Sequence, residues 1–227
     1  PLAAILGYVE LLLDPRSEPA LDPEPRALLE RCRTQLERIQ GIVGQLLDYS
    51  RPAEGQVRAV ALHDAAQRLL SLLRHDPRCR DVTLRLEGDV DVHALADPAH
   101  LDQVLQNLVV NACRAATQAG DAPLVVLRIS SEAGSEAGTE GDAVIEVQDT
   151  GAGVSAELRP RLFEPFVTTA RAGEGTGLGL AICRGLVEAM EGRLDCLPSE
   201  ARAPLVAGGS PGAVFRVILP RGSTHAP

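Results

Sequence analysis

The chain has 227 residues, of which 45% are hydrophobic and only 2% aromatic, with no Trp. Its 22 Lys and Arg residues are outnumbered by 31 Asp and Glu residues, which gives a formal net charge of −9. This composition indicates a globular protein with an aliphatic core and argues against nucleic acid or an anionic membrane as its main partner. No apolar run is long enough to span a bilayer, and the chain begins with Pro1 and not with Met. We therefore expect a cytoplasmic piece of a longer protein, whose membrane anchor, if it has one, precedes Pro1.

The first 50 residues have the pattern of a helical hairpin. Residues 1–13 carry apolar side chains at the 3-4-3 spacing of one helical stripe, and the proline-rich residues 14–25 interrupt the helix. Residues 26–50 repeat apolar positions at 3-4-3-4-3, which is the spacing of a coiled-coil seam. Nothing else in this segment covers the two stripes. We expect either a second copy of the chain, which completes a four-helix bundle, or packing of the hairpin on the chain's own second half.

Residues after about 53 follow a different pattern, in which strands alternate with helices. Helices are predicted at residues 61–73, 98–120, 155–163 and 177–192, and strands at 82–88, 90–97, 124–131, 142–149, 193–198 and 213–220. Strands with helices on one side form a two-layer α/β sandwich. The predicted fold class is therefore α+β, a helical hairpin followed by a two-layer sandwich.

The helix predicted at residues 98–120 carries three polar side chains on one face. Asn107, Asn111 and Arg114 lie at positions i, i+4 and i+7. Two amides and a guanidinium in such a place need partners. A magnesium-bound phosphate chain supplies them, with an amide oxygen on the metal and the guanidinium on a phosphate oxygen. The alternative is a helix face that hydrogen bonds to a neighbouring loop.

Two further segments have the composition of a nucleotide site. VQDTGAGVS places Asp149 at the end of an apolar strand, with Gly151 and Gly153 behind it. A carboxylate there can accept a hydrogen bond from the exocyclic amine of a flat ring, or it can simply cap a tight turn. LFEPFVTT, residues 162–169, leads into a loop that either closes over a nucleotide or covers an edge of the core.

The stretch GEGTGLGLAI, residues 173–182, places glycines directly against the start of a helix. Glycine lets a ligand approach the backbone, and the first turn of a helix presents unpaired N–H groups with a partial positive charge. Together they form an anion site, most often for phosphate, although a flexible connector has the same composition.

In this order, the four segments resemble the N, G1, F and G2 boxes of bacterial sensor histidine kinases. QNLVVNACRA, DTGAGV, LFEPFVTT and GTGLGLAI match in turn, GAVFRVILP resembles the closing strand, and LLDYSRP resembles the end of the dimerisation helix. The resemblance implies a GHKL (Bergerat) ATP-binding catalytic domain at residues 53–227, behind a dimerisation and phosphotransfer hairpin at residues 1–52. It also implies ATP and Mg²⁺ as ligands, a homodimer through residues 1–50, and the receiver domain of a response regulator as partner.

The same resemblance implies roles for individual residues. Asn111 corresponds to the magnesium ligand, Asp149 to the adenine reader and Arg114 to a phosphate contact. After Thr169 this chain has Ala170 where many relatives have Lys, so Arg171 either supplies the lid charge or leaves the lid weakened. The ATP-binding residues implied are Asn107, Asn111, Arg114, Asp149, Gly151, Gly153, Thr168, Thr169, Arg171, Gly175, Thr176, Gly177, Leu178 and Gly179.

The reaction is indicated by one residue that is present and one that is missing. Gyrase-type and mismatch-repair ATPases of this fold carry a general-base Glu where this chain has Asn107, and an amide cannot take a proton. We therefore expect slow hydrolysis and transfer of the γ-phosphate to a histidine. The family pattern H-E-x-x-N-P-L places that histidine upstream of Pro1, so this segment is expected to bind Mg-ATP without phosphorylating itself. The alternatives are an ATPase or Ser/protein kinase on the same fold, and a catalytically idle ATP-binding scaffold.

Overall fold

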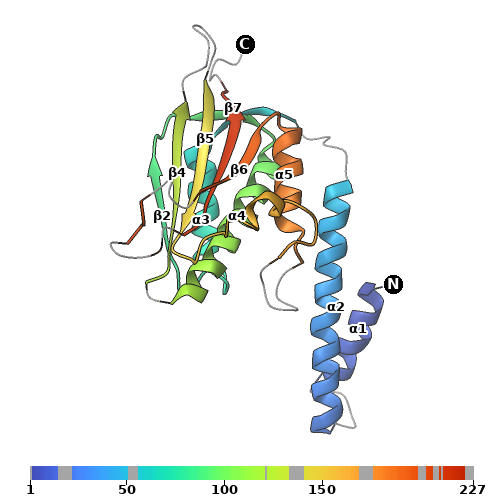
Figure 1. The fold of residues 1–227 in the computed structure, drawn as a ribbon. Helices are drawn as coiled ribbons and strands as arrows, with labels where there is room; N and C mark the ends of the chain where they lie inside the picture. Colours follow the sequence, from blue (N-terminus) through green and yellow to red (C-terminus); the bar gives the residue numbers. More distant parts are fainter. Residues whose placement is uncertain are drawn as a thin grey trace. The chain divides into compact units, whose positions relative to one another are not determined.

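The computed structural model of the protein describes residues 2–14, 22–50, 56–120, 122–132, 141–168, 176–198, 203–206, 210 and 212–222. The chain divides into two compact units, Pro1–Arg51 and Pro52–Pro227. Figure 1 gives the order of the elements along the chain. None of the helices in the described ranges combines the length and the apolar character needed to cross a membrane.

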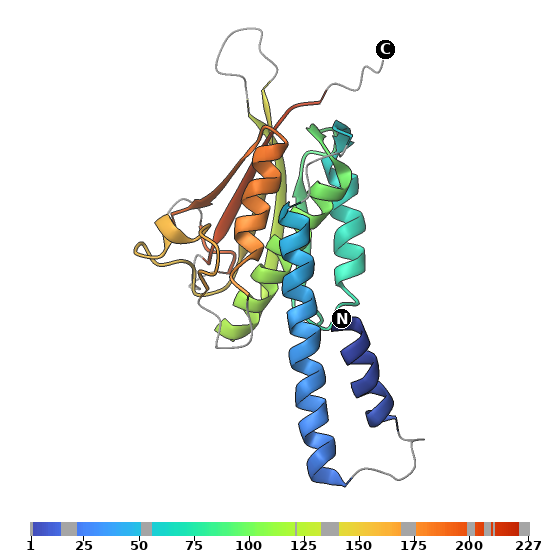
Figure 2. The same ribbon diagram turned by 90° about the vertical axis from the view of Figure 1, so that its right-hand side faces the viewer.

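The first unit is a helical hairpin, as predicted. Helices α1 (Leu2–Leu13) and α2 (Pro23–Ser50) lie side by side (Figure 2). Helix α2 begins earlier than predicted because proline is tolerated in the first turn, where its missing N–H has no helical partner. Val9 and Leu13 of α1 are buried, whereas Tyr8 and Leu11 are 66% and 65% exposed. Part of the apolar surface of α1 is therefore not covered by the described residues of the hairpin.

The second unit contains the remaining elements. They are β1 (Arg58–Ala61), α3 (Leu62–Leu73), β2 (Thr83–Gly88), β3 (His93–Ala96), α4 (Pro98–Ala119), β4 (Leu124–Glu132), β5 (Asp142–Asp149), the 3-10 turn η1 (Arg159–Arg161), α5 (Gly179–Ala189), β6 (Arg193–Leu197) and β7 (Val214–Pro220). Five strands form one sheet in the order β2-β4-β5-β7-β6. β2 pairs with β4 in parallel, and the other neighbours are antiparallel. β1 and β3 form a separate antiparallel pair.

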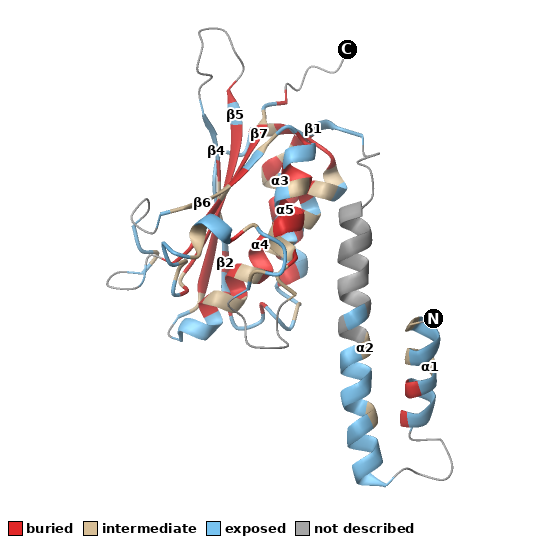
Figure 3. Cartoon of the chain, turned by 45° about the vertical axis from the view of Figure 1, so that its right-hand side comes forward, coloured by how far each residue is buried: buried red, intermediate tan, exposed pale blue. Residues whose placement is uncertain are grey.

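Helices α3, α4 and α5 cover one face of the five-stranded sheet (Figures 1 and 2). Because side chains alternate between the faces of a strand, Val125 and Leu127 of β4 point to the helices, as do Ile145 and Val147 of β5. All four are completely buried, and Figure 3 shows this core between the two layers. The predicted two-layer sandwich is therefore confirmed.

Helix α4 starts and ends where its sequence predicts. The Asp97 side chain caps the helix by accepting a hydrogen bond from the backbone N–H of His100 at 2.9 Å, and Pro98 occupies the first turn. Gly120 follows the last helical residue with a φ of +103°, a value that favours glycine. The cap and the glycine therefore set the two ends of α4.

The structure differs from the predicted elements in two places. The helix expected at residues 155–163 is reduced to the 3-10 turn η1, where Pro160 supplies no N–H to continue a longer helix. The short strand β1 was not predicted, because four residues are too few to show a clear alternation.

Candidate functional site

Helix α4 carries the three polar side chains predicted to share a face. Asn107, Asn111 and Arg114 are all partly exposed, between fully buried neighbours such as Leu108. Within the described ranges, neither Asn111 nor Arg114 makes a hydrogen bond or an ion pair. Both side chains are therefore available to a ligand on this face.

Asn107 is held from the neighbouring helix. The thiol of Cys183 on α5 donates to the backbone oxygen of Val104 at 3.8 Å and interacts with the side-chain amide of Asn107 one turn further along α4. Cys183 is fully buried, and burial raises the pKa of its thiol to about 12. The contact is therefore made by a neutral thiol. Cys183 was not predicted as a site residue, because a cysteine in an apolar helix has the appearance of an ordinary core residue.

Asp149 ends strand β5 in a buried turn. Its Oδ1 atom accepts hydrogen bonds from the backbone N–H groups of Gly151, at 2.7 Å, and Ala213, at 3.2 Å. The side chain is 1% exposed. Burial raises the pKa of the Asp149 carboxyl above its usual value of 3.8, and the two backbone donors offset part of this rise. The second carboxylate oxygen makes no hydrogen bond with the described residues.

The residues that support Asp149 from just before β7 were not predicted as part of the site. Gly212 has a φ of +69°, and a Cβ atom on it would lie 1.7 Å from the backbone oxygen of Asp149. Ala213 both donates to the Asp149 carboxylate and accepts a hydrogen bond from the Asp149 backbone N–H at 3.1 Å. Gly212, just before the last predicted strand, could have indicated a close backbone contact. Nothing in the sequence indicates which strand it contacts.

The turn after Asp149 packs directly on α4. A Cβ atom on Gly151 would lie 2.8 Å from the Cβ of Ala115, the residue that follows Arg114. Gly153 has a φ of +77°, a conformation that side chains other than glycine rarely adopt. This turn therefore brings Asp149 close to the polar face of α4, as a nucleotide site would require.

Helix α5 begins beside Asn111. A Cβ atom on Gly179 would lie 4.0 Å from the Asn111 side-chain nitrogen, and the side chain of Leu178, the residue before the helix, makes no capping hydrogen bond. Just before it, the backbone oxygen of Gly177 accepts a hydrogen bond from Phe166 at 2.9 Å, and the backbone N–H of Leu178 donates to Thr176. The start of α5, where the first N–H groups of a helix have no helical partner, therefore lies beside Asn111.

The structure thus gathers the described parts of the N, G1, F and G2 segments around the second half of α4. Thr168 is exposed at the end of the F segment. Three of the predicted site residues, Thr169, Arg171 and Gly175, lie outside the described residues.

Comparison with protein families identifies this arrangement. Residues 96–223 match the family described as histidine kinase-, DNA gyrase B- and HSP90-like ATPase. The chain belongs to this family. In addition, residues 1–55 match the His Kinase A (phospho-acceptor) domain. The chain therefore places a phospho-acceptor-type hairpin before a histidine kinase-like ATPase domain.

Named relatives of this ATPase domain are sensor kinases. The signal transduction histidine-protein kinase AtoS of Escherichia coli strain K12 is 30% identical over 223 residues, 97% of this chain and 32% of AtoS. The sensor histidine kinase ZraS of Escherichia coli O157:H7 is 32% identical over 221 residues, 97% of this chain and 43% of ZraS. The chain therefore spans less than half of these relatives.

A solved structure shows the same succession of hairpin and ATPase domain. Full-length ShkA, crystallised in complex with AMPPNP, matches with a TM-score of 0.74 and 27% identity, over 100% of this chain and 44% of ShkA. Histidine kinase AdeS of Acinetobacter baumannii, at 21% identity and a TM-score of 0.61, shows the same fold over 98% of this chain and 96% of AdeS.

Proposed function

We propose that the chain is the core of a two-component sensor histidine kinase, which binds Mg-ATP and transfers the γ-phosphate to a histidine for relay to a response-regulator Asp. The observation that carries this proposal is that Asn111, the Asp149 turn and the start of α5 meet at the second half of α4. Residues 1–52 are proposed as the dimerisation and phosphotransfer hairpin and residues 53–227 as the catalytic domain.

The site fits ATP in three respects. One oxygen of the Asp149 carboxylate accepts no hydrogen bond from the described residues and suits the adenine amine, and Arg114, which has no partner among those residues, suits a phosphate oxygen. The N–H groups at the start of α5 suit the rest of the triphosphate. Gly151, Gly153, Gly177 and Gly179 allow the close backbone approach that the site needs. Thr168, Thr169, Arg171, Gly175, Thr176 and Leu178 are proposed to complete the lid.

Asn111 is proposed to hold Mg²⁺. Its amide makes no hydrogen bond with the described residues, and an amide oxygen is a suitable ligand for this hard cation. When bound, Mg²⁺ would neutralise charge on the phosphates during transfer. Asn107 lies one turn before Asn111 on α4 and interacts with the Cys183 thiol. It is proposed to lie near the phosphates.

The two partners are proposed from the hairpin. Ile5, Tyr8, Leu11 and Leu12 of α1 are each about half exposed or more. We propose that a second copy covers this apolar surface, so that residues 1–50 form a homodimeric four-helix bundle. A receiver domain would dock on the hairpin. If the protein has a membrane anchor, ATP and the receiver domain would both bind on its cytoplasmic side.

The experiment that tests the proposed function is phosphorylation of the longer protein, extended upstream of Pro1, with γ-labelled ATP and Mg²⁺. The expected result is protein-bound label that is lost in acid and is absent when the proposed upstream histidine is replaced by Gln. Free phosphate without labelled protein would establish an ATPase instead. If neither product forms although ATP binds, the protein is an ATP-binding scaffold.

Installing a carboxylate at Asn107 distinguishes the kinase from the ATPase. The substitution Asn107→Glu places a general base one turn before Asn111, and such a base accelerates proton transfer by about 10²–10⁴-fold. We expect the release of free phosphate from ATP to rise at least about tenfold, measured by a coupled phosphate assay. Gln106→Glu, an adjacent exposed position with the same charge change, is the control and should leave hydrolysis unchanged. Equal phosphate release by both variants would contradict the role given to position 107.

The raised pKa of Asp149 predicts opposite effects of pH on stability and on binding. Because the folded state favours the protonated carboxyl, this group's contribution to stability is full below 3.8 and is lost as pH rises through the folded-state pKa. Adenine recognition needs the ionised carboxylate, so ATP affinity should fall when pH drops through the same value. Carbon-detected NMR of the Asp149 carboxyl measures this pKa directly. A titration midpoint at or below 3.8 would contradict the prediction.

A further inference from the structure

Cys183 connects helix α5 to the side of α4 that carries the polar site residues. Gly179, at the start of α5, lies beside Asn111. One turn later along α5, Cys183 lies beside Asn107 and Val104, which precede Asn111 on α4, so the two helices run antiparallel here. Cys183 and Val104 are completely buried, whereas Asn107 is partly exposed. The thiol therefore lies at the boundary between the core and the polar face of α4.

The single proton of the thiol decides which atom of Asn107 faces the sulfur. Cys183 Sγ donates this proton to the backbone oxygen of Val104, at 3.8 Å. Only the lone pairs of the sulfur then remain for Asn107, and these accept a hydrogen bond from an N–H group. Burial raises the pKa of the thiol, and the contact with Asn107 lowers it, as a donor group does. The amide nitrogen of Asn107 therefore faces the sulfur.

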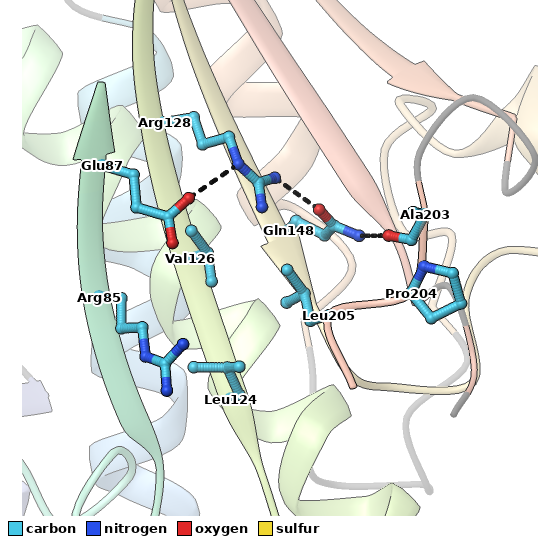
Figure 4. A pocket seen from close by; sticks show the side chains of 9 residues that line it. All are labelled: Arg85, Glu87, Leu124, Val126, Arg128, Gln148, Ala203, Pro204 and Leu205. Carbon is cyan, nitrogen blue, oxygen red and sulfur yellow. Dashed lines mark hydrogen bonds and ion pairs between the residues drawn. The ribbon is translucent and has the colours of Figure 1, made fainter. Parts of the chain in front are cut away.

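The direction of the Asn107 nitrogen also fixes that of its oxygen, because a planar amide turns as one unit. Figure 4 shows another amide of this protein that is held at both atoms. Gln148 accepts through its oxygen from Arg128, at 2.6 Å, and donates through Nε2 to the backbone oxygen of Ala203, at 2.9 Å. Asn107 is held at its nitrogen, and its oxygen accepts no hydrogen bond from the described residues. That oxygen is therefore available to a ligand.

Asn111, one turn further along α4, is turned the same way. A Cβ atom on Gly179 would lie 4.0 Å from the Asn111 Nδ2 atom and farther from its oxygen. Both amides therefore turn their nitrogens toward α5, which leaves both oxygens for a ligand. Amide oxygens suit a hard cation such as Mg²⁺, whereas phosphate oxygens are acceptors and need N–H groups. The orientation of Asn107 thus favours the cation of Mg-ATP over its phosphates.

We propose that Cys183 is a positioning residue of the nucleotide site: its thiol holds the amide of Asn107 so that the oxygen, and not the nitrogen, is offered to the magnesium ion of Mg-ATP. This inference rests on the proposed function. Cys183 then contributes to the affinity for Mg-ATP but not to the affinity for metal-free ATP, because it acts through an oxygen that only the cation uses.

Cys183→Ala tests this role by calorimetry with ATP, once with Mg²⁺ and once with EDTA. Without the sulfur, the Asn107 amide can turn its nitrogen toward the cation. We expect at least about a threefold loss of affinity for Mg-ATP and no change for metal-free ATP. Cys183→Ser keeps a group that donates and accepts, and should restore Mg-ATP affinity. Cys79→Ala removes another buried thiol, in the turn after α3, and should leave both affinities unchanged.

Asn107→Ala separates positioning from packing. If Cys183 acts through Asn107, adding Cys183→Ala to this variant should cause no further loss of Mg-ATP affinity. An effect on the packing of α5 would instead add the same loss in both backgrounds. Additive losses, equal losses with and without Mg²⁺, or parent affinity in Cys183→Ala would overturn the role while the parent still binds ATP. If the parent binds no ATP in either condition, the proposed function is wrong and this inference is wrong with it.

Discussion

Replacing Asp149 by Asn is expected to lower ATP affinity about 10- to 100-fold while leaving the fold intact. The backbone N–H groups of Gly151 and Ala213 both donate to Oδ1, and in the variant they would hold the amide oxygen in the same place. The amide NH₂ group would then face the adenine amine, so that two donors meet. Losing a hydrogen bond to a charged group costs about 1.5–3 kcal/mol, and every 1.4 kcal/mol is about tenfold in affinity.

The measurement is calorimetry with ATP and with GTP, whose ring carries an oxygen in place of the amine. The variant should lose the preference for ATP, and its thermal midpoint should not fall, because the buried charge is removed. Asp142→Asn, at the exposed start of the same strand, is the matched control and should bind like the parent. If Asp149→Asn keeps both the ATP affinity of the parent and its preference for ATP over GTP, Asp149 does not recognise adenine.

Gly177→Ala is expected to reduce both ATP affinity and stability. Gly177 has a φ of +68°, and a Cβ atom there would lie 2.5 Å from the backbone carbon of Phe166. The two segments would have to separate, which would break the 2.9 Å hydrogen bond from Phe166 to Gly177 and displace the start of α5 from Asn111. The left-handed conformation costs a further 1–2 kcal/mol or so for alanine. We expect at least about a tenfold loss of ATP affinity, equivalent to about 1.4 kcal/mol.

Gly120→Ala separates backbone strain from crowding. Gly120 also has a positive φ, +103°, but no heavy atom lies within 4 Å of a Cβ placed on it. This control should lower the thermal midpoint by a few degrees, since about 1 kcal/mol shifts it by roughly 2–8 °C, and should leave ATP affinity unchanged. If Gly177→Ala binds ATP within twofold of the parent, the contact between Phe166 and Gly177 has no part in the site.

Much of the fold was predictable because its elements are long and clearly patterned. The apolar spacing of α4, with Asp97 before it and Gly120 after it, determined both ends of that helix. The alternation in β4 and β5 predicted two of the central strands. The short strand β1 and the turn η1 were missed or misassigned, because three or four residues carry too little periodicity to outweigh neighbouring patterns.

The sequence predicted individual residues of the candidate site but not how they are arranged in space. The i, i+4, i+7 spacing placed Asn107, Asn111 and Arg114 on one helix face without any tertiary information. The hydrogen bond between Ala213 and Asp149 joins residues 64 apart in sequence, and the one between Cys183 and Val104 joins residues 79 apart. Sequence spacing carries no signal for such contacts, because they depend on which strands and helices become neighbours.

The sequence by itself determined the motifs, their order and the family, because residue type and local spacing decide helix faces, turns and capping. Only the tertiary structure decided that the Asp149 turn packs on Ala115, that α5 starts beside Asn111, and that Ala213 donates to the Asp149 carboxylate. These contacts follow from the strand order β2-β4-β5-β7-β6, which brings together residues from opposite ends of the domain. Local chemistry therefore selects the ligand-binding groups, and the packing of sheet and helices sets their distances.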